Sequence, residues 1–256
     1  MPFLRSLLLF FAVAVVASFA AETFAADAGC RAASGPRAPT VVELYTSEGC
    51  SSCPPADRWL SALEGRADVV PLAFHVDYWD SLGWKDRFAQ AQFSQRQAAS
   101  QRTSGAKFAY TPQVVIDGRD TPHWSALNGA ALTGAAAAAN APLALVLERQ
   151  GDALQLTVAP RAGATLPAHL AGYVAVVDDG LQTRVGAGEN RGATLKQDAV
   201  VREFLPWSAS SAATTQTLRF TPKAAPDPDA KRHWVAVATD ADTGRALQAV
   251  TLACPR

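Results

Sequence analysis

The stretch VVELYTSEGCSSCPPAD (residues 41–57) places two cysteines, Cys50 and Cys53, directly after an apolar run. The apolar start at Val41–Tyr45 predicts a buried strand, and the spacing of the apolar residues after the motif predicts a helix over Asp57–Leu63. A Cys-X-X-Cys pair can be bridged within one turn of chain, and each sulfur can attack or leave in exchange with another disulfide. This spacing indicates thiol–disulfide chemistry, although half a zinc site or an inert disulfide has the same spacing.

The first 25 residues are typical of a cleaved secretory signal. Arg5 precedes the apolar run Leu7–Ala21, which is shorter than the roughly 20 residues that a membrane span needs. We therefore expect a signal peptide over residues 1–25, a periplasmic or secreted location and no stable membrane span.

The other two cysteines lie at the two ends of the mature chain. In an oxidising compartment, an even cysteine set favours a structural disulfide between Cys30 and Cys254. A lipidated Cys30 is the alternative, although Asp27 occupies a position where a lipidation box has an aliphatic residue. No second close pair exists to complete a zinc site, so no metal is expected.

The composition is that of a folded soluble protein, with 49% hydrophobic residues. The 23 basic and 23 acidic residues balance, and no lysine or arginine run exists. Without a basic patch, nucleic-acid binding is not expected.

Strands and helices alternate after the cysteine motif. Further elements are predicted at Val69–Val76 (strand), Asp86–Arg102 (helix), Gln113–Gly118 (strand) and Ser125–Ala139 (helix). This order resembles the thioredoxin fold over about residues 40–140. The resemblance implies a cis bond before Pro112, beside the cysteine pair, and a backbone at Thr111 that is presented to a thiol-bearing substrate.

The second half of the chain shows the alternating pattern of β-strands. A hairpin surrounds Gly151-Asp152, and short strand-like runs follow at 172–177, 217–221, 234–239 and 247–252. The predicted fold is an α/β thioredoxin-like domain (residues 26–140) followed by an all-β sandwich-like domain (residues 141–256).

A closer resemblance rests on four segments: ELYTSEGCSSCPPAD, FHVDYWDSLGWKD, YTPQVVIDGR and GENRGATLKQDAVVR. Together they are similar to a bacterial secreted family of thioredoxin-like proteins that is known only as a domain of unknown function. The resemblance implies a thioredoxin-like first domain and a β-rich remainder, and it brings no substrate.

The thioredoxin pattern implies that Cys50 is the exposed nucleophile and that Cys53 resolves the mixed disulfide. Pro54 and Pro55 move the expected helix start to about Pro54, which leaves the identity of the nucleophile open. Glu43, a nearby carboxylate, is a candidate proton relay.

Three aromatic residues after the second strand, Tyr78, Trp79 and Trp84, are candidates to line a substrate groove. Core packing is the alternative interpretation of this cluster. The GENRG segment around Glu189 and Asn190 predicts a turn, with an interdomain contact as the alternative.

The leading hypothesis is a thiol–disulfide oxidoreductase that acts on exported proteins and needs no cofactor. Its partners are a protein or peptide thiol or disulfide substrate and a redox-resetting partner. One alternative is a copper(I)-handling protein that uses both thiolates with His75 or His123. The other is a non-catalytic thioredoxin-like binding module with a fixed disulfide.

Overall fold

The computed structural model describes residues 30–127, 132, 140–209 and 213–255, and these residues are mostly β-strand. Before residue 140 the strands are β1 (Cys30–Ala33), β2 (Thr40–Thr46), β3 (Val69–His75), β4 (Gln113–Ile116) and β5 (Arg119–Asp120). The later strands are β6 (Leu143–Gln150), β7 (Ala153–Pro160), β8 (Leu170–Asp179), β9 (Leu181–Arg184), β10 (Thr194–Gln197), β11 (Val200–Ala209), β12 (Gln216–Phe220), β13 (Lys231–Asp240) and β14 (Ala246–Leu252). The described helices are α1 (Pro54–Ser61), α2 (Ala91–Ser104) and two single 3-10 turns at Asp80–Leu82 and Trp124–Ala126. The predicted signal peptide and most of the predicted helix Ser125–Ala139 lie outside the described residues.

One eight-stranded sheet organises the molecule, with the order β14-β13-β8-β11-β3-β2-β4-β5. Strands β2 and β3 run parallel, and β4 runs antiparallel to β2. Strand β11 joins β3 in parallel, with Val200 opposite Ala73 and the Ala73 amide donating to the Ala199 carbonyl. Strands from both halves of the chain therefore share this sheet.

This sheet corrects the predicted fold class. The α/β thioredoxin-like domain followed by an all-β sandwich-like domain is wrong, because the described chain is mostly β and its first-half strands continue into second-half strands. The physical reason lies at β3, which would otherwise leave a row of unpaired backbone groups at a sheet edge. Strand β11 pairs with that edge. Hydrophobic periodicity predicts where strands lie along the chain, but it does not identify their partners.

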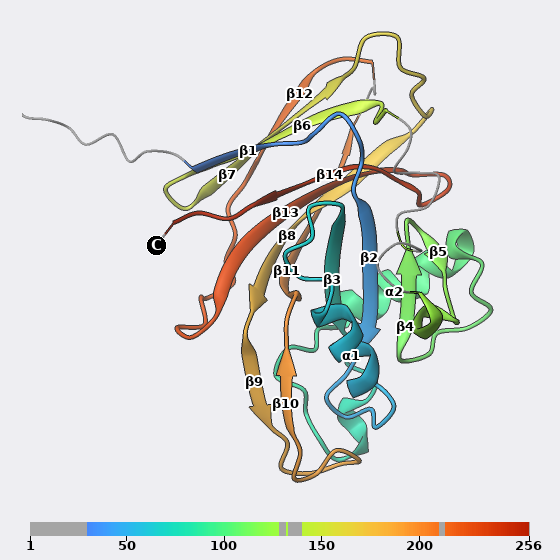
Figure 1. Cartoon of the computed structure of the whole chain (residues 1–256), viewed down its shortest axis with the longest axis vertical. Helices are drawn as coiled ribbons and strands as arrows, with labels where there is room; N and C mark the ends of the chain where they lie inside the picture. Colours follow the sequence, from blue (N-terminus) through green and yellow to red (C-terminus); the bar gives the residue numbers. More distant parts are fainter. Residues whose placement is uncertain (1–29, 128–131, 133–139, 210–212, 256) are drawn as a thin grey trace, which may run out of the picture.

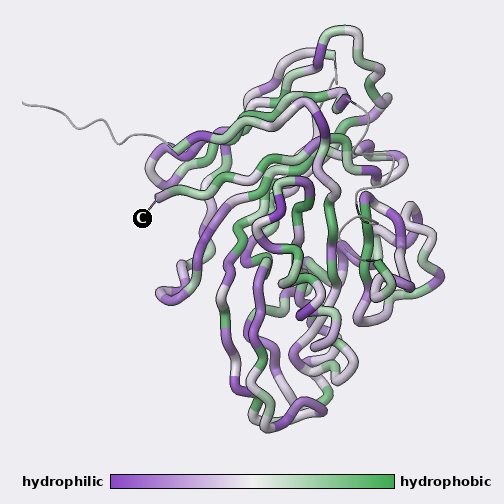
Figure 2. The backbone as a smooth tube through the Cα atoms, in the orientation of Figure 1, coloured by the Kyte–Doolittle hydropathy of each residue, from purple (hydrophilic) through white to green (hydrophobic). Residues whose placement is uncertain are grey.

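A second sheet has four strands in the order β1-β6-β7-β12. Figure 1 shows it lying across one end of the large sheet, while the β9–β10 hairpin extends beyond the other end beside α1. Apolar side chains of the two sheets meet in one core, which includes Leu145, Leu156, Val174 and Trp234. Figure 2 shows that hydrophobic residues recur along the strands at the centre of the molecule.

The two α-helices cover opposite faces of the β2–β3 region. Successive side chains of a strand point to opposite faces. The Thr46 hydroxyl donates to Asp57 of α1, whereas the ring of the preceding residue, Tyr45, stacks on Phe74, which contacts Phe93 of α2. The α1 face therefore carries Thr46 and its registered neighbour, His75.

The helix boundaries follow local chemistry. Helix α1 begins at Pro54, as the proline pair predicts, because proline is tolerated in the first turn of a helix. The helix predicted from Asp86 begins only at Ala91. The carboxylate of Asp86 instead accepts backbone hydrogen bonds from Phe88 and Glu48, which fixes a turn before α2.

Candidate functional site

A Cys50–Cys53 disulfide lies between the end of β2 and the start of α1. The turn is fixed by backbone hydrogen bonds from Cys50 to Ser47 and from Cys53 to Cys50. The carbonyl of Cys53 accepts from the amides of Ala56 and Asp57, so Cys53 caps the helix. The first two helical residues, Pro54 and Pro55, carry no N–H, and the next two amides are bonded to the Cys53 carbonyl, so no free helix amide is left to bind a thiolate here.

Both cysteines of the bridge are buried, with 0% exposed area. This differs from the expectation that Cys50 is exposed. The two intervening residues, Ser51 and Ser52, are exposed, so the turn itself reaches the surface. The Ser52 hydroxyl lies 3.4 Å from the Cys50 sulfur.

The segment that binds the cysteine turn is the loop between β9 and β10, residues 185–193, here named the cap loop. The side-chain amide of Asn190 donates to the carbonyls of Glu48 and Cys50, each over 2.9 Å. The backbone N–H of Ser51 donates to the Glu189 carboxylate over 3.0 Å. The predicted turn is present, with Arg191 N–H bonded to the Gly188 carbonyl, and the alternative contact between the halves of the chain is present as well.

The Thr111–Pro112 bond is cis, as the resemblance implies. The indole N–H of Trp79 donates to the Thr111 hydroxyl over 2.8 Å. A side-chain Cβ at Gly49 would lie 3.4 Å from the Cβ of Trp79, so the same tryptophan packs on the turn before Cys50. Trp79 thus connects the Thr-Pro segment with the cysteine turn.

The three predicted groove residues have different surroundings. Tyr78 is 41% exposed, and Trp79 is half-buried between the two site segments. The indole N–H of Trp84 donates to the buried carboxylate of Glu48, and its side chain lies against Gly188 of the cap loop. Trp84 therefore supports the cap loop.

Glu43, the candidate proton relay, lies on the α2 face of the sheet. Its carboxylate is paired with Arg96 of α2 and accepts a hydrogen bond from the Tyr173 hydroxyl over 2.7 Å. The Tyr45 hydroxyl is a third donor. Because α1 and the cysteine bridge lie on the other face, these contacts give Glu43 a role in attaching α2 to the sheet.

A buried acid–base cluster lies on the α1 face instead. The imidazole Nδ1 of His75 lies 2.6 Å from the carboxylate of Asp86, and both side chains are almost fully buried. Asp57 accepts a hydrogen bond from Thr46, the strand neighbour of His75, over 2.8 Å. Among the described residues, Nε2 of His75 has no hydrogen-bond partner.

The cluster shifts the acidity of its members. Burial raises the pKa of Asp57 to about 6, although the charge of His75 and the Thr46 hydrogen bond act in the opposite direction. Burial opposes the charge on His75, but Asp86 outweighs this effect, so the His75 pKa is raised. For Asp86, burial is likewise outweighed, by His75, and its pKa is lowered.

Sequence reasoning included His75 only as a copper ligand and missed Asp57 and Asp86. The spacing of Asp57 carried a usable signal, because a residue four positions after Cys53 lies one helical turn further along the same face. Asp86 gave no such signal, since only the fold brings it to His75.

The second disulfide, Cys30–Cys254, is present as predicted. It joins β1 to the segment after β14 across a sequence separation of 224 residues. Because the Cys30 sulfur is part of this bridge, the structure does not favour its lipidation.

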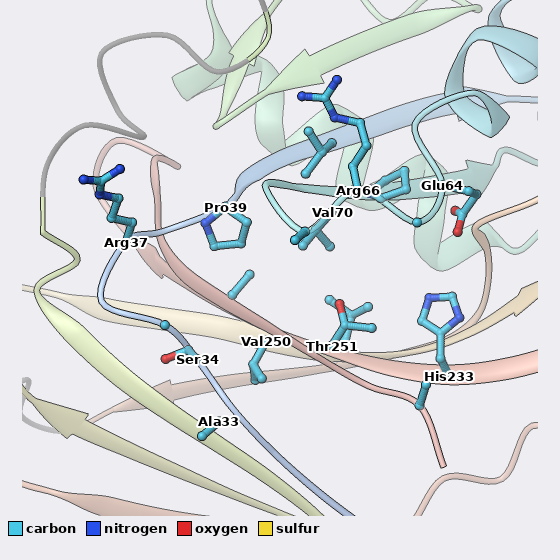
Figure 3. Close-up of a pocket in the computed structure, with 18 of the residues that line it drawn as sticks. Ala33, Ser34, Arg37, Pro39, Glu64, Arg66, Val70, His233, Val250 and Thr251 are labelled. Carbon is cyan, nitrogen blue, oxygen red and sulfur yellow. The ribbon is translucent and has the colours of Figure 1, made fainter. Parts of the chain in front are cut away.

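A cavity of about 520 Å³ lies near the other end of α1, away from the cysteine bridge. Figure 3 shows Glu64 and His233 facing one another across it, with Arg37 and Arg66 further along its wall. His233 pairs with Asp179 over 3.0 Å. Burial, then the charge of Asp179, raises the pKa of Glu64 to about 7. None of the described residues that line this cavity is a cysteine, so we assign it no part in thiol chemistry.

Within the described part of the chain, no group of three or more His, Cys, Asp or Glu side chains is arranged to hold a metal ion. The two predicted copper ligands have different surroundings: the imidazole of His75 is buried and paired with Asp86, whereas His123 is exposed. None of the described helices is long and apolar enough to cross a membrane.

Residues 41–238, which contain the cysteine bridge, the acid–base cluster and the cap loop, match a family described as "Protein of unknown function (DUF1223)". The chain belongs to the DUF1223 family. No curated protein matches this DUF1223 chain.

Two solved structures are similar to the DUF1223 chain. A protein from Agrobacterium tumefaciens superimposes with a TM-score of 0.61 at 23% identity, covering 85% of this chain and 95% of that chain. HBP35 of Porphyromonas gingivalis superimposes with a TM-score of 0.57 at 15% identity, covering 85% and 76%, respectively. At these identities the similarity concerns the fold alone.

Proposed function

We propose that this DUF1223 protein is a periplasmic or secreted thiol–disulfide oxidoreductase in which Cys50 and Cys53 alternate between a disulfide and two thiols. The observation that carries the proposal is the bridge at the start of α1, with a buried His–Asp pair on the same sheet face. A bridge that serves only to fasten a turn needs no acid–base groups beside it. The resemblance of the Cys-X-X-Cys and Thr-Pro segments to thioredoxin-like proteins supports the same chemistry.

The reaction proceeds by thiol–disulfide exchange. A partner thiolate attacks Sγ of Cys50, the Cys50–Cys53 bond breaks, and its electron pair leaves on Cys53, which takes up a proton. A second partner thiolate then attacks the mixed disulfide, so that the partner is oxidised and both cysteines are reduced. We assign the attack to Cys50 because it adjoins the exposed serines, whereas Cys53 forms the helix cap.

The substrate is a protein or peptide thiol or disulfide, and a separate redox partner resets the pair. Two of the large apolar side chains that are exposed, Tyr78 and Phe108, belong to segments next to the Thr111–Pro112 bond. They offer apolar contacts to residues that flank a partner cysteine. Both cysteines are buried, and the cap loop is hydrogen-bonded to the turn that holds them, so the cap loop opens before a partner reaches the bridge.

The test is to capture the mixed disulfide with oxidised glutathione, which gives one glutathione sulfur to the adduct and releases the other as reduced glutathione. In Cys53→Ser, Cys50 is free and has no resolving partner, so we expect it to form a glutathione adduct that mass spectrometry detects as a single stoichiometric addition. The matched variant, Cys50→Ser, leaves only the helix-cap cysteine, and we expect at least tenfold slower labelling. Failure of both variants to react, with the fold intact, would contradict the proposal.

A non-catalytic binding module is the second candidate, and the complete burial of both sulfurs favours it. In that case the bridge fixes the turn beneath the cap loop and never opens during function. Both cysteine variants would then retain partner binding, and the wild-type bridge would persist in reducing glutathione buffers.

A further inference from the structure

The buried cluster beneath α1 contains more ionisable groups than a structural ion pair requires. His75 and Asp86 satisfy one another through Nδ1, yet Nε2 of His75 is buried with no partner among the described residues. A buried polar atom without a partner costs free energy, so its presence in a native site calls for an explanation. The carboxyl group of Asp57 shares the same face.

Asp57 links this cluster to the cysteine bridge. Its backbone N–H donates to the Cys53 carbonyl, and its side chain follows Cys53 by one helical turn. Its carboxyl group is held by Thr46, which is registered with His75 across the β2–β3 pair. The chain of neighbours therefore runs from Cys53 through Asp57 to His75 and Asp86.

Asp57 also has access to solvent. It lines a cavity of about 240 Å³ between α1 and β10, together with Pro54, Arg58, Thr194, Leu195 and Lys196. Water in this cavity can return a proton to Asp57 after each exchange step. Cys53, which is completely buried, has no comparable access of its own.

We propose that Asp57 is the acid–base residue of Cys53, and that the His75–Asp86 pair positions and charge-balances it. This inference rests on the proposed oxidoreductase function and names a residue that acts within it. When the bridge opens, the Asp57 carboxylic acid gives its proton to the Cys53 thiolate. When the bridge closes, the Asp57 carboxylate takes that proton back as the Cys53 sulfur attacks the mixed disulfide and expels the partner thiolate.

The charged neighbours of Asp57 determine in which direction each of them shifts its pKa. Asp57 faces His75 from β3, Asp86 from the loop before α2, Arg58 from its own helix and Lys196 from β10. The charge of Glu48 also raises the pKa of His75. The positive charge of His75 lowers the pKa of Asp57, and Asp86 raises it. Removal of His75 therefore makes Asp57 hold its proton to higher pH.

The experiment measures the rate of bridge reduction by dithiothreitol between pH 5 and 9, with each rate divided by the thiolate fraction of the reagent. In the wild-type protein we expect this corrected rate to decline above about pH 6, as Asp57 loses its proton. Asp57→Asn should lose the decline and react at least tenfold more slowly at pH 5, since general acids typically contribute 10²–10⁴-fold. Asp57→Glu should restore the decline, and His75→Gln should move it to higher pH.

Glu64→Gln is the matched control, because Glu64 is also a partly buried carboxyl group but lies beyond the end of α1, at the other cavity. We expect this variant to keep the wild-type profile. A wild-type profile without a decline would overturn the inference, and so would an unchanged profile in Asp57→Asn. If dithiothreitol and glutathione never open the wild-type bridge, the proposed function itself fails, which is a separate outcome from a reactive bridge with a flat profile.

Discussion

The side-chain amide of Asn190 lies 2.9 Å from the backbone carbonyl oxygen of Cys50, although the two residues are 140 positions apart in the chain. The same amide also binds the Glu48 carbonyl. A residue from the second half of the chain thus closes the turn that contains the first site cysteine. We therefore expect access to the bridge to depend on the cap loop.

Asn190→Ala should make the bridge more reactive. The substitution removes two hydrogen bonds, each of which contributes about 0.5–1.5 kcal/mol. A loss of about 1.4 kcal/mol corresponds to a tenfold change in the opening equilibrium. We expect roughly tenfold faster reduction by dithiothreitol, whereas Asn140→Ala, at an exposed asparagine outside the site, should react like the wild type. Equal rates in the two variants would show that the cap loop does not limit access.

Asp57→Asn should stabilise the protein at neutral pH. The folded-state pKa of Asp57 is about 6, above its unfolded value, so the folded state binds more protons and stability falls as the pH rises through this range. Asparagine retains an acceptor for Thr46 and carries no charge. After discounting for partial exposure, we expect a gain of about 1–2 kcal/mol at pH 8 that disappears below about pH 4. Urea unfolding at both pH values measures this gain. A loss of stability in Asp57→Asn at pH 8 would contradict the claim that the ionised Asp57 carboxylate destabilises the folded protein.

The His75–Asp86 pair should stabilise the folded protein most at intermediate pH, because its two members lose their contributions at opposite ends of the pH range. The raised pKa of His75 contributes stability that is present below its unfolded value and is lost as pH rises through the folded value. The lowered pKa of Asp86 contributes stability above its unfolded value, which is lost as pH falls through the folded value. We therefore expect His75→Gln to flatten the alkaline limb of the stability curve. An unchanged alkaline limb would indicate that His75 is neutral in the folded protein.

Breaking the terminal disulfide should lower stability without affecting the site. The Cys30→Ser and Cys254→Ser double variant opens a long loop, which typically costs about 2–4 kcal/mol. Guanidinium unfolding measures the loss. Reduction of the Cys50–Cys53 bridge should proceed at the wild-type rate, and a large change in that rate would show that the two bridges are coupled.

Gly118→Ala should be destabilising because of the contact between the two halves of the chain. Gly118 follows β4, has a φ of +83° and faces the turn between β13 and β14. An added Cβ would lie 2.3 Å from the Gly244 carbonyl oxygen. Both Gly118 and Gly65 have a positive φ, so a side chain at either position carries the cost of that backbone conformation. Beyond this shared cost, we expect Gly118→Ala to lose about 2 kcal/mol or more of unfolding free energy, and Gly65→Ser, whose Cβ position is open, to lose almost none. Equal losses would argue against this close approach.

The sequence allowed the strands and the cysteine chemistry to be located, but not the way the strands associate. The buried runs at β2 and β3, the start of α1 at Pro54 and the terminal disulfide were all predictable from local pattern. The pairing of β11 with β3 was not, because Val200 and Ala73 lie 127 positions apart and period-2 alternation names no partner.

The site was predictable only in part. Cys50 and Cys53 stand out by spacing, whereas Asn190, Asp86 and Asp57 matter through contacts that depend on the fold. Glu43 drew attention as one of the carboxylates near the motif in sequence, yet alternation along β2 places it on the opposite face, beside Arg96. A carboxylate's separation from a cysteine along a strand is therefore a poor guide to which face it shares.

The most direct test of the central claim is the reduction potential of the Cys50–Cys53 pair. The purified mature protein is equilibrated in graded glutathione buffers, alkylated and mapped by mass, so that the terminal disulfide is followed separately. We expect a reversible transition within about −120 to −270 mV, the range of known exchange proteins. A pair that stays bridged below about −300 mV would contradict the oxidoreductase and indicate a permanent structural disulfide.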